Sequence, residues 1–175
     1  MRLFIAVQLT DDMKNALTSV QTFLRTHGVH GNFTQLDNLH LTLAFIGEYA
    51  DPDYVLDAMR AVAFSPFSIR LEGFGSFGDL YWSGIGGSEE LAVCVKRLRR
   101  TLAEQGIPFD RKKFSPHMTL IRKASFDKRA GFPGVTVSDA AMEFQTISLM
   151  RSDRAKNGMV YTALETITAI NSETK

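Results

Sequence analysis

The pattern His-x-Thr-Leu occurs twice in the chain, at residues 40–43 and at residues 117–120. Both copies lie in apolar segments typical of β-strands, and residues two apart on a strand share a face. Each copy therefore presents one imidazole and one hydroxyl side by side, while the intervening residue points into the core. The four side chains are His40, Thr42, His117 and Thr119.

Two such pairs that face one substrate have the groups needed for phosphoryl transfer. An imidazole with a pKa near ~6.5 gives or takes a proton close to neutrality, so one histidine can act as base and the other as acid. Threonine hydroxyls can donate to phosphate oxygens, and together these groups act on a phosphodiester without a metal. A single copy would be typical of a structural histidine, but two of the chain's four histidines share the pattern.

The segments 38–48 (NLHLTLAFIGE) and 116–122 (PHMTLIR) resemble the paired motifs of the two-histidine phosphoesterases. More narrowly, they resemble the bacterial RNA 2′,3′-cyclic phosphodiesterases, historically called 2′-5′ RNA ligases. The resemblance extends over nearly the whole chain, because an opening strand at 2–7 and a hairpin near the C-terminal end also match.

This resemblance implies a bilobal α+β fold with a pseudo-twofold axis, in which two mainly antiparallel sheets flank a central cleft and helices pack outside. It also implies hydrolysis of a terminal 2′,3′-cyclic phosphate to a 2′-phosphate, without metal or cofactor. By position, His40 would be the proton donor and His117 the proton acceptor. Thr42 and Thr119 would contact the phosphate oxygens.

Arg122 matches an arginine that commonly follows the second motif in this family, and a cation there could bind phosphate. On a regular strand, however, Arg122 shares its face with Met118 and Leu120 and points away from His117. A β-bulge or a twist at the strand end would be needed to bring the guanidinium to the site.

Aromatic side chains near the motifs are candidates for stacking on a nucleobase, as in proteins that bind single strands. The same residues are also typical of a hydrophobic core. The candidates are Phe45, Phe114, Tyr81 and Trp82, of which we retain Trp82 and Phe45 as possible stacking residues.

The elements that must position the motifs can be predicted from hydrophobic periodicity. Helices are expected from Thr10 or Asp11 to Gly28, from Asp51-Pro52 onwards, and from Ser88 to Gly106. Strands are expected at 2–8, 39–46, 66–73, 79–85, 117–122, 141–150 and 159–168, and the last two could pair as a hairpin. Strands do not alternate regularly with helices, so we predict an α+β fold with antiparallel sheet, forming a single domain over residues 1–175.

The composition excludes several classes of protein. The chain has 175 residues, of which 45% are hydrophobic, and its single cysteine excludes a disulfide framework and multi-cysteine metal sites. Cys94 is expected to be an inert packing residue. No apolar run reaches membrane-spanning length, and the first residues turn acidic too soon for a signal peptide. We therefore expect a cytoplasmic monomer without a membrane partner.

The charge distribution is asymmetric along the chain. Residues 1–95 carry 5 basic and 11 acidic side chains, whereas residues 96–175 carry 15 basic and 8 acidic ones. Such asymmetry indicates either an anionic partner or solvated surface. If the partner is RNA, the basic residues Lys112, Lys113, Lys128 and Arg129 are expected to border the cleft.

A glycine-rich run in the middle of the chain matches a dinucleotide-binding pattern. The run Gly73–Gly78 matches G-x-G-x-x-G, but a strand rather than a helix is expected after it, so we interpret the glycines as a hairpin turn.

The leading function is hydrolysis of cyclic phosphates at RNA or oligonucleotide ends. The alternatives are a small cyclic phosphate substrate, 2′-5′ RNA joining, and a non-catalytic module that binds RNA ends.

Overall fold

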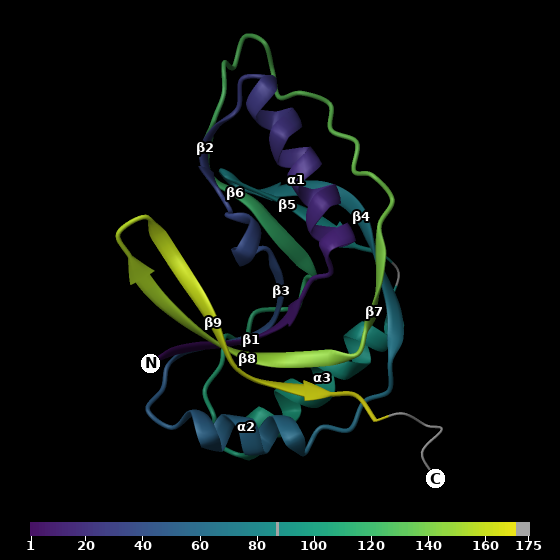
Figure 1. The fold of residues 1–175 in the computed structure, drawn as a ribbon, viewed down its shortest axis with the longest axis vertical. Helices are drawn as coiled ribbons and strands as arrows, with labels where there is room; N and C mark the ends of the chain where they lie inside the picture. Colours follow the sequence, from purple (N-terminus) through teal and green to yellow (C-terminus); the bar gives the residue numbers. More distant parts are fainter. Residues whose placement is uncertain (87, 171–175) are drawn as a thin grey trace.

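A computed structural model describes residues 1–86 and 88–170, and within them the chain forms two antiparallel sheets and three α-helices (Figure 1). The elements are β1 (Arg2–Gln8), α1 (Asp11–Thr26), β2 (His30–Phe33), η1 (Leu36–Asn38), β3 (His40–Glu48), α2 (Pro52–Arg60), β4 (Phe67–Phe77), β5 (Leu80–Ile85), α3 (Glu89–Glu104), β6 (His117–Ser125), β7 (Ala141–Phe144), β8 (Thr146–Ala155) and β9 (Gly158–Thr168). This arrangement confirms the predicted α+β class.

The two sheets each contain one copy of the repeated motif. The four-stranded sheet has the order β3-β1-β8-β9, so the strand with the first motif lies at its edge. The five-stranded sheet has the order β2-β6-β5-β4-β7, so the strand with the second motif lies inside it. The strands β3 and β6 also contact each other, which brings the two motifs to the junction of the sheets.

The helices cover the outer faces of the sheets, as expected. Helix α1 packs against β2, β6 and β7, whereas α2 and α3 pack against each other and against the four-stranded sheet (Figure 1). The helix starts follow from capping residues: the hydroxyl of Thr10 accepts from the amide of Met13, and that of Ser88 accepts from the amide of Leu91. None of the helices in residues 1–86 and 88–170 is long and apolar enough to cross a membrane.

The larger of two hydrophobic core clusters lies between the sheets and the helices, and the smaller contains Phe4, Ala6 and Met150. The motif residues that point inwards are among the most buried members of the larger cluster, since Leu41, Leu43, Met118 and Leu120 are all fully buried. Cys94 is also buried in this core, on α3. With the apolar side chains of both motifs anchored in the core, their histidines and threonines face the other way.

The structure differs from the expected strands at two places. The segment 141–150 is not one strand: it divides at Gln145 into β7, which pairs with β4, and β8, which pairs with β1 in the other sheet. The short strand β2 was not expected, because its sequence HGNF lacks the apolar character of a strand. It pairs with the end of β6 beside the second motif.

The interpretation of Gly73–Gly78 as a turn was wrong for most of its length. The residues up to Phe77 continue strand β4, and the turn itself lies at Gly78 and Asp79. Gly75 lacks a side chain because the ring of Trp82 covers it: a Cβ there would lie 2.5 Å from a carbon of that ring. This glycine serves side-chain packing rather than turn geometry.

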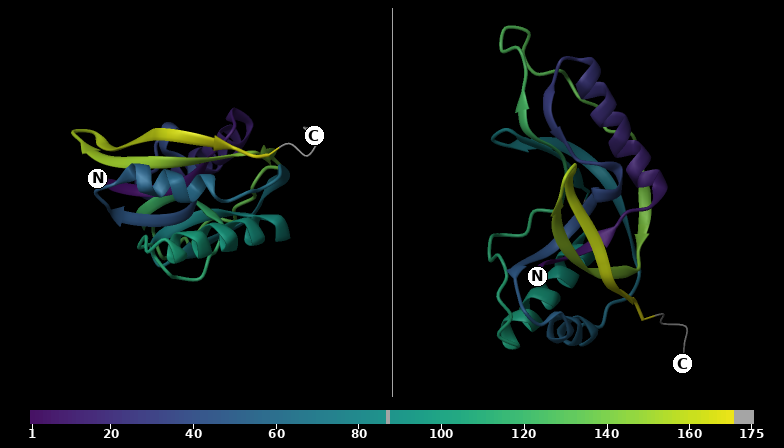
Figure 2. Two further views of the ribbon diagram at one scale, coloured as in Figure 1. Left: turned by 90° about the horizontal axis from the view of Figure 1, so that it is seen from below. Right: turned by 60° about the vertical axis from the view of Figure 1, so that its left-hand side comes forward.

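The predicted hairpin near the C-terminal end is present as β8 and β9, which pair up to Ala155 and Gly158. The tip of this hairpin projects from the body of the molecule (Figure 2). Strand β8 pairs with β1, and residues of both hairpin strands line the pocket around the first motif.

Candidate active site

The first motif holds His40 in a defined tautomer. Its Nδ1 donates to the carbonyl oxygen of Asn38 at 2.6 Å, and its Nε2 lies 2.8 Å from the hydroxyl oxygen of Thr42. Because a carbonyl oxygen only accepts hydrogen bonds, Nδ1 carries a proton. The nitrogen that remains for proton transfer is therefore Nε2, next to the Thr42 hydroxyl.

The second motif fixes its histidine by the same kind of hydrogen bond. Nδ1 of His117 donates to the carbonyl oxygen of Ser115 at 2.6 Å, again two residues earlier in the chain. Its Nε2 is therefore also available for proton transfer. Thr119 stands on the same face of β6, half-buried, but it lines neither of the pockets described below.

A β-bulge in β6 changes which residues face the site. Opposite the consecutive residues Tyr81 and Trp82 of β5 lie Ile121 and Thr119, so Leu120 is the extra residue. The bulge reverses the alternation of side chains beyond it. Leu120 and Ile121 are both fully buried, and Arg122 comes to the face of His117, which the regular strand parity would not allow.

The first motif has an equivalent bulge. Along β1, Ile5 pairs with Ala44 and Ala6 pairs with Thr42, so Leu43 is skipped. As a result Phe45 lies on the face of His40 and Thr42. The fifth residue after each histidine thus reaches the site, an aromatic residue in one copy and an arginine in the other.

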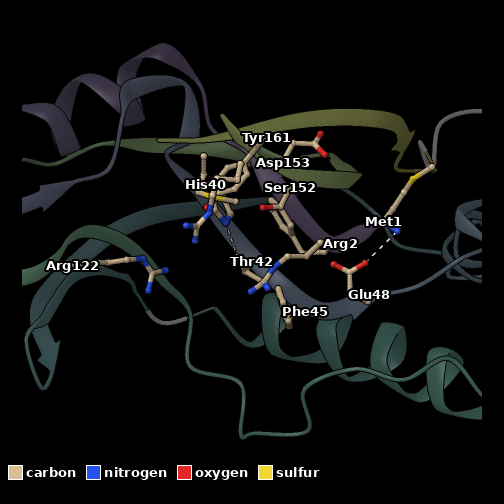
Figure 3. Close-up of a pocket in the computed structure, with 13 residues that line it drawn as sticks. Met1, Arg2, His40, Thr42, Phe45, Glu48, Arg122, Ser152, Asp153 and Tyr161 are labelled. Carbon is tan, nitrogen blue, oxygen red and sulfur yellow. Dashed lines mark hydrogen bonds and ion pairs between the residues drawn. The ribbon is translucent and has the colours of Figure 1, made fainter. Parts of the chain in front are cut away.

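Two pockets meet at these residues. One, of about 700 Å³, includes His40, Arg122, Arg2 and Tyr161 in its lining (Figure 3). The other, of about 440 Å³, is lined by His117 together with Phe77, Phe114, Ser115, Lys112 and Lys113. Thr42 and Phe45 line both, so the pockets are two arms of one cleft.

Aromatic rings enclose His40. The ring of Phe4 lies 4.9 Å from the imidazole, and that of Tyr161 lies edge-on at 5.2 Å. This burial lowers the pKa of His40 from its ordinary 6.5, and the neighbouring Arg122 and His117 lower it further, against the opposing bond to Asn38. The free protein therefore favours a neutral His40 near pH 7.

Aromatic rings also contact His117, but differently. Phe77 lies edge-on at 5.2 Å and Trp82 is tilted at 6.1 Å. Trp82 packs between His117 and Gly75 and lines neither arm of the cleft, whereas Phe45 lines both. Of the two stacking candidates, the structure brings only Phe45 to the cleft wall.

A half-buried arginine joins the two motif regions. Arg99 of α3 donates from Nε to the carbonyl oxygen of Leu43 at 3.1 Å and from Nη1 to that of Lys112 at 2.7 Å. The amide of Asp110 also donates to the carbonyl oxygen of Phe45 at 2.8 Å. These bonds attach the segment 106–116, which leads to His117, directly to the strand of the first motif.

Sequence reasoning missed Arg99, and also Phe4 and Tyr161. Arg99 lies within the basic run KRLRR, where nothing distinguishes it from its solvated neighbours except that it falls beside the apolar stripe of the helix. Phe4 and Tyr161 reach His40 only through strand pairing, which the chain order does not reveal.

Of the basic residues expected at the cleft, Lys112 and Lys113 line the arm beside His117. Lys128 and Arg129 lie in the turn after β6 and line neither arm. In the described parts of the chain, no three histidine, cysteine, aspartate or glutamate side chains gather closely enough to hold a metal ion.

Comparison with known sequences identifies a family for the chain. The profile of the 2′-5′ RNA ligase superfamily matches residues 11–156. A Thermus thermophilus protein named RNA 2′,3′-cyclic phosphodiesterase is 33% identical over 181 residues, which cover 94% of this chain and 88% of that protein. A Geobacillus stearothermophilus protein of the same name is 34% identical over 133 residues, which cover 69% of this chain and only 41% of that longer protein.

Solved structures have the same fold. The crystal structure of a Thermus thermophilus protein is 30% identical, with a TM-score of 0.75 over 96% of this chain and 97% of that one. That of E. coli LigT in its apo form is 24% identical, with a TM-score of 0.80 over 97% of this chain and 98% of that one.

Proposed function

The chain belongs to the 2′-5′ RNA ligase superfamily, and on this basis we propose that it is an RNA 2′,3′-cyclic phosphodiesterase. The reaction is the addition of water to the terminal cyclic phosphate of an RNA or oligonucleotide, which leaves a 2′-phosphate and a free 3′-hydroxyl. Relatives named for this activity and the geometry of the cleft support the proposal.

The observation that carries the proposal is the doubled histidine arrangement. Each imidazole is fixed through Nδ1 by a backbone carbonyl, and each leaves Nε2 for proton transfer. The two imidazoles face different arms of one cleft, and Thr42 and Phe45 line both arms. Such an arrangement suits a displacement at phosphorus, in which a base acts on one side and an acid on the other.

The bond changes follow from this arrangement. Nε2 of His117 accepts a proton from water as the water oxygen bonds to phosphorus. The bond from phosphorus to the 3′-oxygen breaks, and Nε2 of His40 gives its proton to that oxygen. Hydroxyl donors, Thr42 foremost, and the guanidinium of Arg122 stabilise the charge on the non-bridging oxygens. Solvent then returns both imidazoles to their starting protonation states.

The lowered pKa of His40 is compatible with its role as acid. An imidazolium with a lowered pKa releases its proton more readily to the leaving oxygen. The free protein favours neutral His40, so His40 must take up a proton from solvent when the anionic substrate binds, because a phosphate beside the imidazole favours its charged form. We therefore propose that substrate binding and proton uptake by His40 are coupled.

The proposed mechanism has no step that requires a metal ion. The protons move through imidazoles, and the charge on phosphate is met by hydroxyls and Arg122. We expect the rate to be unchanged by EDTA. Activity lost in EDTA and restored by a divalent ion would contradict this part of the proposal.

A direct assay tests the function. Purified protein is incubated with adenosine 2′,3′-cyclic phosphate and with a dinucleotide that ends in the same group, and the 2′- and 3′-phosphate products are separated. We expect the 2′-phosphate alone. No turnover of either substrate, with the protein bound to both, would instead support the module that binds RNA ends without catalysis.

A further inference from the structure

The arm of the cleft beside His40 continues along the four-stranded sheet beyond the histidines (Figure 3). Its floor is built by strand register: Arg2 of β1 pairs with Ser152 of β8, which pairs with Tyr161 of β9. Two residues further along β8, Arg154 pairs with Met159. All five side chains line this arm.

The charges in this part of the cleft are not balanced. Its two carboxylates already have partners: Glu48 lies 3.4 Å from the amino group of Met1, and Asp153 lies 2.7 Å from Arg151. Within residues 1–86 and 88–170, no carboxylate lies within ion-pair distance of Arg2 or Arg154. Arg2 and Arg154 therefore face the arm without a carboxylate partner.

The position of Arg2 places its charge between the histidines and the far end of the arm. Ala6 pairs with Thr42, and Arg2 lies four residues further along β1, about 13 Å away at Cα. The guanidinium lies beside Phe45, with Cζ 5.0 Å from the ring centre. Phe45 and Thr42 line the cleft together, so the Arg2 cation lies beside the wall that carries Thr42.

The volume is also larger than one phosphate requires. About 700 Å³ lies within the range of pockets that hold a nucleotide-sized ligand. Arg122, from the other sheet, is already assigned to the reacting phosphate. Arg2 and Arg154 come from strands β1 and β8 of the first sheet, so they present their donors from the opposite wall.

We propose that Arg2 and Arg154 bind a second phosphate group of the substrate, on the 5′ side of the nucleotide that carries the cyclic phosphate. Guanidinium groups suit this ligand because they donate paired hydrogen bonds to phosphate oxygens. The group is either a 5′-phosphate or the phosphodiester that leads to the preceding nucleotide. This inference rests on the proposed function and makes the enzyme selective for substrates with two phosphates.

Three substrates separate the possibilities. Adenosine 2′,3′-cyclic phosphate has one phosphate, the same compound with a 5′-phosphate has two, and a dinucleotide ending in the cyclic phosphate has a phosphodiester in the second place. We expect kcat/KM for both two-phosphate substrates to exceed that for the simple nucleoside about tenfold. If kcat/KM is higher only for the dinucleotide, the site binds the phosphodiester. If it is higher only for the 5′-phosphate compound, the site binds a terminal phosphate.

The variants Arg2→Gln and Arg154→Gln, alone and together, test the residues. The double variant should reduce the advantage of a second phosphate from about tenfold to about twofold or less, and it should flatten the dependence of kcat/KM on salt. Lys156→Gln is the matched control, because Lys156 lies at the tip of the same hairpin and does not line the arm. It should leave the advantage intact.

Several outcomes would overturn the inference. The first is a wild-type enzyme with equal kcat/KM for all three substrates. The second is a double variant that keeps the full advantage of a second phosphate. The third is a Lys156→Gln variant that loses as much of this advantage as the double variant. Absence of any turnover would instead contradict the proposed function. In that case calorimetric binding of adenosine 2′-phosphate and adenosine 2′,5′-bisphosphate still decides the matter: the bisphosphate should bind about tenfold more tightly, and only while Arg2 and Arg154 are present.

Discussion

The two copies of the His-x-Thr motif share their backbone geometry and differ in their surroundings. In each copy the imidazole Nδ1 donates to a carbonyl oxygen two residues earlier, and in each a bulge brings the fifth residue after the histidine to the site. The first copy lies on an edge strand and places an aromatic ring there. The second lies on an inner strand and places an arginine there.

This difference shows how two nearly identical sequence motifs can take different roles. His40 is enclosed by Phe4 and Tyr161, which lowers its pKa, whereas His117 borders an arm with two lysines. The shared geometry makes both imidazoles competent for proton transfer. The side chains contributed by other strands and loops then distinguish the two, so the asymmetry lies outside the motifs.

The largest expected effect comes from removing either histidine. His40→Ala and His117→Ala should each lower kcat by roughly 10²–10⁴-fold, because each proton transfer contributes about that much. The double variant should fall by less than the product, since the two residues act as a unit. Steady-state kinetics on adenosine 2′,3′-cyclic phosphate measure these changes, and His27→Ala, on the exposed end of α1, is the control.

A substrate with sulfur in place of the 3′-oxygen sharpens this comparison. Its leaving group needs no acid, so it should restore activity to His40→Ala and not to His117→Ala. Recovery of His117→Ala instead would reverse the assigned roles.

Phe45 and Arg122, each the fifth residue after a motif histidine, should affect different kinetic parameters. Arg122→Gln removes a cation from the reacting phosphate and should lower kcat/KM roughly 10- to 100-fold, mainly through kcat. Phe45→Leu keeps an apolar wall but removes the ring, and it should raise KM severalfold with little change in kcat. If both variants altered only KM, the residues that the two bulges bring to the site would not differ in function.

Breaking the connection between the motifs should have a smaller effect. Arg99→Lys keeps a charge but has one nitrogen, which cannot reach the carbonyl oxygens of both Leu43 and Lys112. We expect kcat to fall about three- to tenfold and the amide of Asp110 to exchange faster with deuterium, because the segment before His117 loosens. Arg100→Lys, at an exposed pair with Glu104 on the same helix, should change neither.

The smallest expected effect is a shift of one titration. In the free wild-type protein, the NMR titration of His40 should have its midpoint below 6.5, because burial lowers its pKa. Tyr161→Ser admits water and should move the midpoint up towards 6.5, while Tyr161→Phe keeps the ring and should not. Bound adenosine 2′-phosphate should also raise it. A midpoint above 6.5 in the free wild-type protein would contradict the proposed enclosure.

Much of the fold could be predicted because local patterns agreed with it. The three helices have capping residues and apolar stripes, and the terminal hairpin has two strands around a turn. The division of 141–150 could not be predicted, since a strand that leaves one sheet for another shows no change in composition at Gln145. Strand β2 forms only because the end of β6 offers it a partner.

For the candidate site, the motif pairs could be predicted, but strand parity alone did not decide the position of Arg122. The signal was present in the sequence: Leu43-Ala44 and Leu120-Ile121 are consecutive apolar residues that interrupt regular alternation, as a bulge does. The remaining neighbours of the histidines come from distant segments. Tyr161 reaches His40 only after β9 has paired with β8, and Arg99 reaches Leu43 only after α3 has packed on β3.

The place of β1 between β3 and β8 also has a consequence for biosynthesis. On the ribosome, β1 and β3 emerge before β8 and β9, so the four-stranded sheet cannot be completed until the chain has been translated as far as Thr168. The second sheet, with its motif, needs nothing beyond Phe144. In the nascent chain, the half-site of His117 can therefore mature first, and the half-site of His40 closes last, although it is encoded earlier.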